Sequence, residues 1–136
     1  MSPDPVRPGS PEDWLAHARS DLALSEMKRT RTVLYEHLCF HAQQAAEKAI
    51  KAVLVSKRVR FPKAHDLAFL IDLLPADATL PPALIDLPVL TRYAVLQRYP
   101  GEHPPVTFVH RRRAVQLAEE AVIWASHCVA TQRHAS

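Results

Sequence analysis

The sequence predicts an all-α protein, an antiparallel up-and-down bundle of four main helices plus one short helix. The chain has twelve prolines but only two glycines, and a glycine-poor chain has few of the positive-φ turns that connect antiparallel strands. Apolar residues also recur at spacings of three and four through long stretches that contain neither proline nor glycine. Because 136 residues suffice for one hydrophobic core but not for two ordinary domains, a single domain is expected.

The domain is expected to occupy residues 11–131. Residues 1–10 carry three prolines and no apolar periodicity, which predicts a disordered lead-in. Residues 132–136 are expected to form a flexible tail.

The first two helices have clear boundary signals. Ser10 is a favoured capping residue, and Pro11 suits the first helical position, so a helix is predicted over 11–28. Residues 32–57 contain no glycine or proline and predict the long central helix. Its apolar face consists of Leu38, Ala42, Ala45, Ala49 and Val53, and its polar stripe of His41, Gln44, Lys48 and Lys51.

Three segments complete the bundle. A short helix is expected to begin near His65-Asp66 and to end at Pro75, and the proline-rich residues 75–88 form a connection. Residues 89–98 predict a further helix, and Thr107 is a suitable cap for the last one. The face of that last helix comprises Val115, Ala118, Val122, Ala125 and Val129.

Charge and cysteine content indicate the compartment. Seventeen Lys and Arg against fourteen Asp and Glu give a formal charge of +3, which is compatible with an anionic partner. Cys39 and Cys128 lie inside apolar helical patterns, so neither a disulfide nor a zinc cluster is expected. No apolar run approaches the length of a membrane span, and the N-terminus lacks the apolar segment of a signal peptide. We therefore expect a cytoplasmic protein that has no membrane partner.

Two clusters of polar residues could bind ligands. His37 and His41 have the i, i+4 spacing of paired metal ligands, but no acidic pair completes a site, so no metal is expected. Arg111, Arg112 and Arg113 stand near the start of a helix, where positive charges oppose the macrodipole. A bound phosphate would relieve that repulsion, although a solvated face balanced by later glutamates is an equal alternative.

Arg98 and His103 flank the turn RYPGEH between two predicted helices. A histidine can transfer a proton near neutral pH, and a guanidinium can hold a phosphate through two parallel hydrogen bonds. Together they suffice, without a metal, to activate an RNA 2′-hydroxyl against its neighbouring phosphate. On spacing alone a structural loop is favoured, in which Arg98 caps its own helix and His103 only makes hydrogen bonds.

Two stretches of the chain resemble a known family. They are FHAQQAAEKAIKAVLVSKRVRFPKAHDLAFLIDLL, residues 40 to 74, and LTRYAVLQRYPGEH, residues 90 to 103. They resemble the HEPN family, the "higher eukaryotes and prokaryotes nucleotide-binding" domains, and the resemblance covers about residues 12 to 130. It implies a helical bundle that forms a homodimer, often encoded beside a minimal nucleotidyltransferase as a toxin–antitoxin-like pair.

The resemblance also implies a function. Many HEPN proteins carry an arginine followed four to six residues later by a histidine, and that motif cleaves RNA without a metal or other cofactor. Arg98 and His103 match it. The resemblance therefore implies an endoribonuclease in which His103 is the general acid or base, Arg98 clamps the phosphate, and the product is a 2′,3′-cyclic phosphate. Tyr99 is a candidate for stacking on a base, and residues 111–113 for guiding the RNA.

The alternative function is a non-catalytic module that binds a nucleotide or a partner and works with a nucleotidyltransferase. Tyr99 favours it, because many active members have a small polar residue or a histidine after the arginine. Pro105 stands where some members carry a tyrosine that the nucleotidyltransferase modifies, so that mode of regulation is not expected here.

Overall fold

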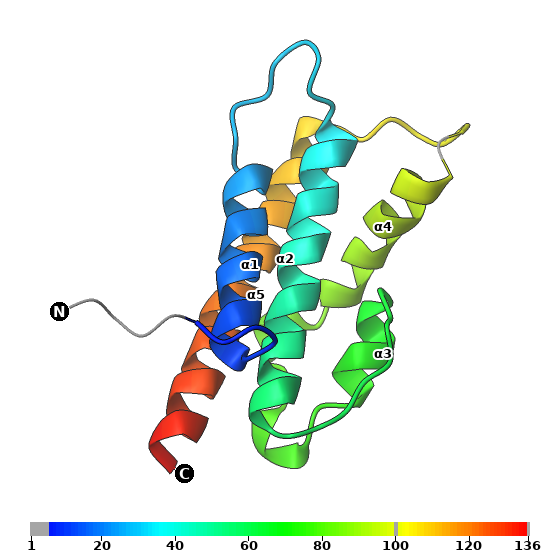
Figure 1. Cartoon of the computed structure of the whole chain (residues 1–136). Helices are drawn as coiled ribbons and strands as arrows, with labels where there is room; N and C mark the ends of the chain where they lie inside the picture. The colour runs from blue at the N-terminus through cyan, green and yellow to red at the C-terminus, as the bar shows by residue number, and fades with distance from the viewer. Residues whose placement is uncertain (1–5, 100, 136) are drawn as a thin grey trace, which may run out of the picture.

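The computed structural model describes residues 6–99 and 101–135, and within them it contains only helices and connections. The α-helices are α1 (Pro11–Ser25), α2 (Tyr35–Ser56), α3 (Leu67–Asp72), α4 (Thr91–Arg98) and α5 (Phe108–Ala135). Figure 1 shows α2 between α1 and α4, with α5 running behind α1 and α2. The predicted all-α bundle with one short helix is therefore confirmed.

The start of α1 follows the capping signals of the sequence. The Ser10 hydroxyl accepts a hydrogen bond from the backbone N–H of Asp13 at 3.1 Å, and Pro11 is the first helical residue. A turn precedes the cap, closed by the Ser10 N–H on the Arg7 carbonyl. The expected disorder of the lead-in thus does not extend to residues 7–10, and residues 1–5 lie outside the described part.

The end of α1 comes three residues earlier than the prediction of 28. At Ser25 the side-chain hydroxyl donates to the Leu22 carbonyl at 2.6 Å. The guanidinium of Arg111, from α5, then donates to the carbonyls of Ser25 and Met27. These carbonyls are bound by a distant side chain, so local helix signals could not place the boundary.

The central helix α2 forms the middle of the core. All five residues of its predicted apolar face are buried, which confirms that face. Lys51 was wrongly assigned to the polar stripe, because its side chain is only 7% exposed. Its ammonium lies 3.0 Å from the Glu47 carboxylate, so the buried cation has a buried counter-charge.

The Glu47 carboxylate is the centre of a buried polar network. Gln43 donates to it from the preceding turn at 3.1 Å, and Nδ1 of His65 lies 2.8 Å from the same oxygen. Gln43 also donates to the backbone carbonyl of His65. The network therefore attaches the segment before α3 to the centre of α2.

The connection from α2 to α4 contains more regular structure than expected. Asp66 caps α3 by accepting hydrogen bonds from the N–H groups of Ala68 and Phe69. Three short 3₁₀ turns follow at Ala76–Ala78, Pro82–Leu84 and Leu87–Leu90. They place Leu84, Leu87 and Leu90 in the core at 0 to 1% exposure. The proline-rich segment thus covers one side of the bundle.

The last two helices differ from their predicted limits by a few residues. Residues 89 and 90 belong to a 3₁₀ turn, so α4 begins at Thr91. Pro100, which was expected to end this helix, lies outside the described residues. The α5 helix continues through residues 132–135, which were expected to be a flexible tail. Within the described ranges, no helix is long and apolar enough to cross a membrane.

Candidate functional site

His103 lies in the segment between α4 and α5 and bonds to the start of α2. Its Nε2 is 3.3 Å from Oε2 of Glu36, and its Nδ1 is 2.9 Å from the backbone oxygen of Pro104. Both partners can only accept hydrogen bonds, so the imidazolium form of His103 makes both bonds at once. The pair is partly accessible, with side-chain exposures of 24% and 26%.

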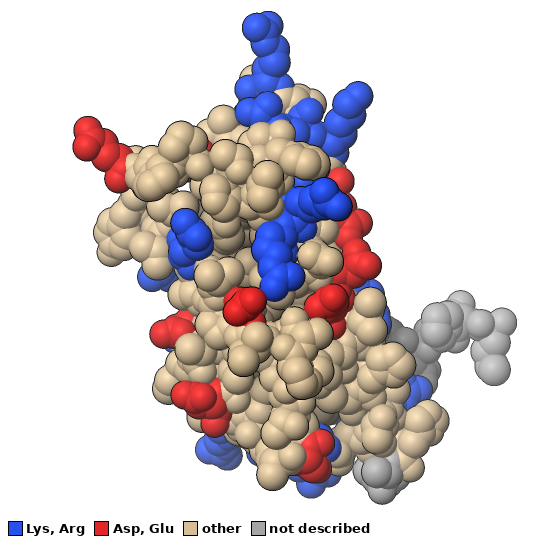
Figure 2. Space-filling view, turned by 180° about the vertical axis from the view of Figure 1, so that it is seen from behind, with Lys and Arg blue, Asp and Glu red and all other residues tan. Residues whose placement is uncertain are grey.

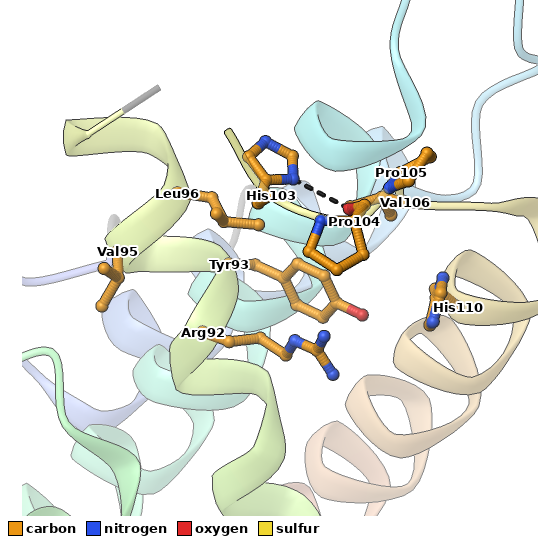
Figure 3. Close-up of a pocket in the computed structure, with 9 residues that line it drawn as sticks. All are labelled: Arg92, Tyr93, Val95, Leu96, His103, Pro104, Pro105, Val106 and His110. Atoms are coloured by element: carbon orange, nitrogen blue, oxygen red, sulfur yellow. Dashed lines mark hydrogen bonds between the residues drawn. The ribbon is translucent and has the colours of Figure 1, made fainter. Parts of the chain in front are cut away.

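A hollow of about 350 Å³ adjoins His103 between α4 and α5. Figure 3 shows Tyr93 and Arg92 pointing from α4 toward α5, which carries His110. The hollow is lined by Arg92, Tyr93, Val95, Leu96, His103, Pro104, Pro105, Val106 and His110. It therefore combines an apolar floor with two histidines and one guanidinium, a set that suits an anionic ligand with an apolar or aromatic part.

Tyr93, which lines this hollow, and Cys39, which is hydrogen-bonded to Tyr93, both have raised pKa values. Burial raises the pKa of the Tyr93 hydroxyl to about 12, and the nearby Cys39 thiol adds to the shift. Burial likewise raises the pKa of Cys39 to about 11, although a hydrogen bond with Tyr93 and the charges of Arg111 and Arg92 oppose it. Both groups thus stay neutral near pH 7, and neither serves as a base there.

Arg98 does not line the hollow beside His103 but two other hollows. It is exposed at the end of α4 and lines two smaller hollows, of about 160 and 280 Å³. His65 lines both, and the exposed Tyr99 ring, 74% accessible, borders the larger one. Within one chain, no described hollow is lined by both Arg98 and His103.

The three consecutive arginines near the start of α5 have different surroundings. Arg111 donates to the Ser25 and Met27 carbonyls at 2.8 and 3.1 Å, which holds the end of α1. Arg113 contacts Asp86 at 3.2 Å in an exposed ion pair. Arg112 is exposed and has no recorded side-chain partner among the described residues. Arg112 therefore has the guanidinium most available to a ligand.

The two histidines considered as metal ligands have protein partners. Nδ1 of His37 lies 3.2 Å from the side-chain amide of Gln97, and Nδ1 of His41 lies 3.0 Å from the Asp21 carboxylate. Residues 6–99 and 101–135 contain no group of three or more His, Cys, Asp or Glu side chains able to hold a metal ion.

Sequence reasoning missed several residues around His103 and Arg98. Glu36, Arg92 and His110 surround or face His103, and His65 shares the hollows of Arg98. Glu36 is separated from His103 by 67 positions, so no local spacing connects them. Arg92 carried a weak signal, because it stands six residues before Arg98 on the same helix.

The family comparison covers almost the whole fold. The family model of the HEPN domain matches residues 11–128. The chain belongs to the HEPN family. No curated protein matches it.

Two solved structures support this HEPN assignment at the level of the fold. The crystal structure of TT1696 from Thermus thermophilus describes a chain that is 28% identical, with a TM-score of 0.76, over 88% of this chain and 98% of that one. The structure of "ST0689, an archaeal HEPN homologue" is 24% identical with a TM-score of 0.51, over 92% and 96% of the two chains. The HEPN bundle therefore extends over nearly all of this sequence.

Proposed function

We propose that this HEPN protein is a metal-independent endoribonuclease that acts as a homodimer through Arg98 and His103. The observation that carries the proposal is the environment of His103. A carboxylate orients the imidazole, the ring lies beside a hollow large enough for a nucleotide, and a second histidine and Arg92 line the same hollow.

The reaction needs two proton transfers. A base takes the proton of the ribose 2′-hydroxyl, whose oxygen attacks the adjacent phosphorus. The bond from phosphorus to the 5′ oxygen breaks, and an acid protonates that oxygen. The products are a 2′,3′-cyclic phosphate and a 5′-hydroxyl. His103 serves as one of these groups, because histidine gains and loses a proton near neutral pH. The reacting oxygen of the RNA takes the place of the Pro104 oxygen at Nδ1, while Glu36 keeps its bond to Nε2.

Arg98 serves as the phosphate clamp. A guanidinium places two N–H donors against two phosphate oxygens and offsets the charge that builds up as the phosphorus becomes five-coordinate. Arg98 and His103 of one chain line different hollows among those described, and a homodimer would bring a second copy of both side chains to one RNA. Tyr99, whose ring is exposed, stacks on a base. Of Arg111, Arg112 and Arg113, the exposed Arg112 contacts the RNA backbone, because the other two already bind protein groups.

The test is cleavage of a mixed RNA pool by the purified protein in excess EDTA. We expect cleavage with 2′,3′-cyclic phosphate ends, reduced about 10²- to 10⁴-fold by His103→Ala. The matched control is His17→Ala, because His17 is exposed on α1. If the wild-type protein does not cleave, or if His103→Ala cleaves equally fast, the proposal is wrong.

A second candidate function is a non-catalytic nucleotide-binding or partner-binding module that works with a minimal nucleotidyltransferase. It is favoured because Arg98 and His103 line different hollows among those described, and because the exposed Tyr99 ring lies beside the larger Arg98 hollow. An arginine and an accessible aromatic ring suffice to bind the phosphate and base of a nucleotide without chemistry. Calorimetry with nucleoside monophosphates distinguishes the two functions: micromolar binding that Arg98→Ala abolishes, without RNA cleavage, supports the module.

A further inference from the structure

The loop between α1 and α2 carries a second group of cations. Lys28, Arg29 and Arg31 lie within four consecutive residues, and all three are exposed. Residues 26–34, here named the basic loop, contain one acid, Glu26. Across the described chain, no ion pair with a carboxylate is recorded for these three cations. Figure 2 shows basic side chains projecting from the top of the molecule, where Figure 1 places this loop.

The basic loop is held by several contacts rather than being free. Arg111 binds the carbonyls of Ser25 and Met27 at its start. The Val33 N–H donates to the Thr30 carbonyl at 3.2 Å within it. These bonds restrain the backbone of the loop, so that it loses less backbone entropy on binding than an unrestrained segment would.

The basic loop is connected to His103 indirectly, through the first two residues of α2. The Arg29 guanidinium lies over the Tyr35 ring, 4.3 Å from its centroid. Tyr35 precedes Glu36, whose carboxylate is 3.3 Å from His103. The basic loop, His103 and the start of α5 therefore lie at the same end of the bundle (Figure 1).

We propose that the basic loop binds the phosphate backbone of single-stranded RNA and continues the path of the strand away from His103. The inference rests on the proposed function for the identity of the polyanion. Three exposed cations within four consecutive residues suit a repeating anion, because each cation can pair with a separate phosphate. The phosphates would replace solvent and counterions around Lys28, Arg29 and Arg31.

The experiment measures binding of a fluorescein-labelled 20-nucleotide oligouridylate by anisotropy. All proteins carry His103→Ala, so that the RNA stays intact. The test protein adds Lys28→Gln, Arg29→Gln and Arg31→Gln. The matched control adds Arg7→Gln, Arg58→Gln and Arg60→Gln instead, which removes the same charge from exposed residues at the other end of α1 and α2. The far end of α2 is about 33 Å away, the length of a helix of 22 residues.

We expect the basic-loop variant to bind RNA on the order of 100-fold more weakly at 0.1 M salt. The slope of log K for RNA binding against the logarithm of the salt concentration should become less steep by about 2. The RNA affinity of the control variant should stay within about threefold of that of the protein that carries His103→Ala alone, because the cations replaced in the control do not face the strand. Circular dichroism of both variants shows whether the fold is kept.

Each other outcome overturns the inference. Equal losses in both triple variants would show a general effect of net charge. RNA binding that the basic-loop substitutions leave unchanged would place the strand elsewhere. Loop-dependent binding to phosphatidylserine vesicles but not to RNA would identify a membrane surface as the partner. RNA cleavage is measured in a separate assay, with proteins that keep His103. The nuclease proposal can therefore fail while the basic loop still binds RNA, and the basic loop can fail to bind RNA while cleavage is observed.

Discussion

The carboxylate of Glu36 lies 3.3 Å from Nε2 of His103 and joins the first turn of α2 to the segment before α5. The other ring nitrogen of His103 is bonded to the Pro104 carbonyl. A histidine held at both nitrogens has a fixed ring orientation, and its cationic form has a counter-ion. Glu36 is therefore a positioning residue for the proposed proton transfer.

Glu36→Gln should slow RNA cleavage on the order of tenfold, because the amide no longer stabilises the imidazolium form. It should not weaken RNA binding, since it removes a negative charge beside the strand. Single-turnover kinetics separate the two quantities. Glu102→Gln is the matched control, because Glu102 is exposed beside His103 and carries the same charge. A variant that loses RNA affinity instead of rate would contradict the assignment.

The sequence predicted the helices well because their information is local. The cap at Ser10 and the apolar face of α2 depend on residues a few positions apart, and the structure has both. The surroundings of the site depend on contacts between distant segments, such as Glu36 with His103 or Arg111 with Ser25. No periodicity encodes those contacts, so the site could be predicted only as far as the residues of its motif.

The burial of Lys51 in the core likewise could not be predicted from local spacing. A lysine beside buried positions on a helix normally extends to solvent, so the sequence placed it on the polar face. The structure buries it because Glu47, one turn earlier, supplies a counter-charge, and because Trp14 and Phe61 lie 5.5 and 5.7 Å from its ammonium. The aromatic contacts come from other segments, which the spacing on α2 could not reveal.

Arg111→Ala should destabilise the fold by about 1.5–3 kcal/mol, because two charge-assisted hydrogen bonds to the end of α1 are lost. Arg112→Ala should change stability by less than about 0.5 kcal/mol, because that side chain is exposed. Urea unfolding followed by circular dichroism measures both. Equal effects of the two substitutions would show that the carbonyl contacts of Arg111 contribute nothing to stability.

Glu47→Ala should destabilise the protein by about 3–5 kcal/mol, because the buried ammonium of Lys51 is left without its counter-charge. Lys51→Met should cost less than Glu47→Ala if His65 keeps its bond to the carboxylate. Thermal unfolding of the two variants gives the comparison. Lys63→Met serves as the control, since Lys63 is exposed. A Glu47→Ala variant as stable as the wild type would exclude a structural role for the network.

The stability of the fold should fall as the pH rises above about 9. Burial raises the pKa of Cys39 from 9.0 to about 11 and that of Tyr93 from 10.0 to about 12. The folded state therefore binds more protons than the unfolded state between these values, and stability is lost as the pH rises through them. Below pH 9 both groups are neutral in either state, so this contribution is constant there.

Replacing both groups tests that interpretation. Cys39→Ala combined with Tyr93→Phe removes the two ionisations, so its free energy of unfolding should decline less between pH 9 and 11 than that of the wild type. Lower stability at pH 7 is expected from the small cavity left by the thiol, which is why the slope with pH, rather than the absolute stability, is the quantity compared. Urea titrations at pH 7, 9, 10 and 11 provide it. Parallel curves for the two proteins would show that the ionisation of Cys39 and Tyr93 does not cause the alkaline loss.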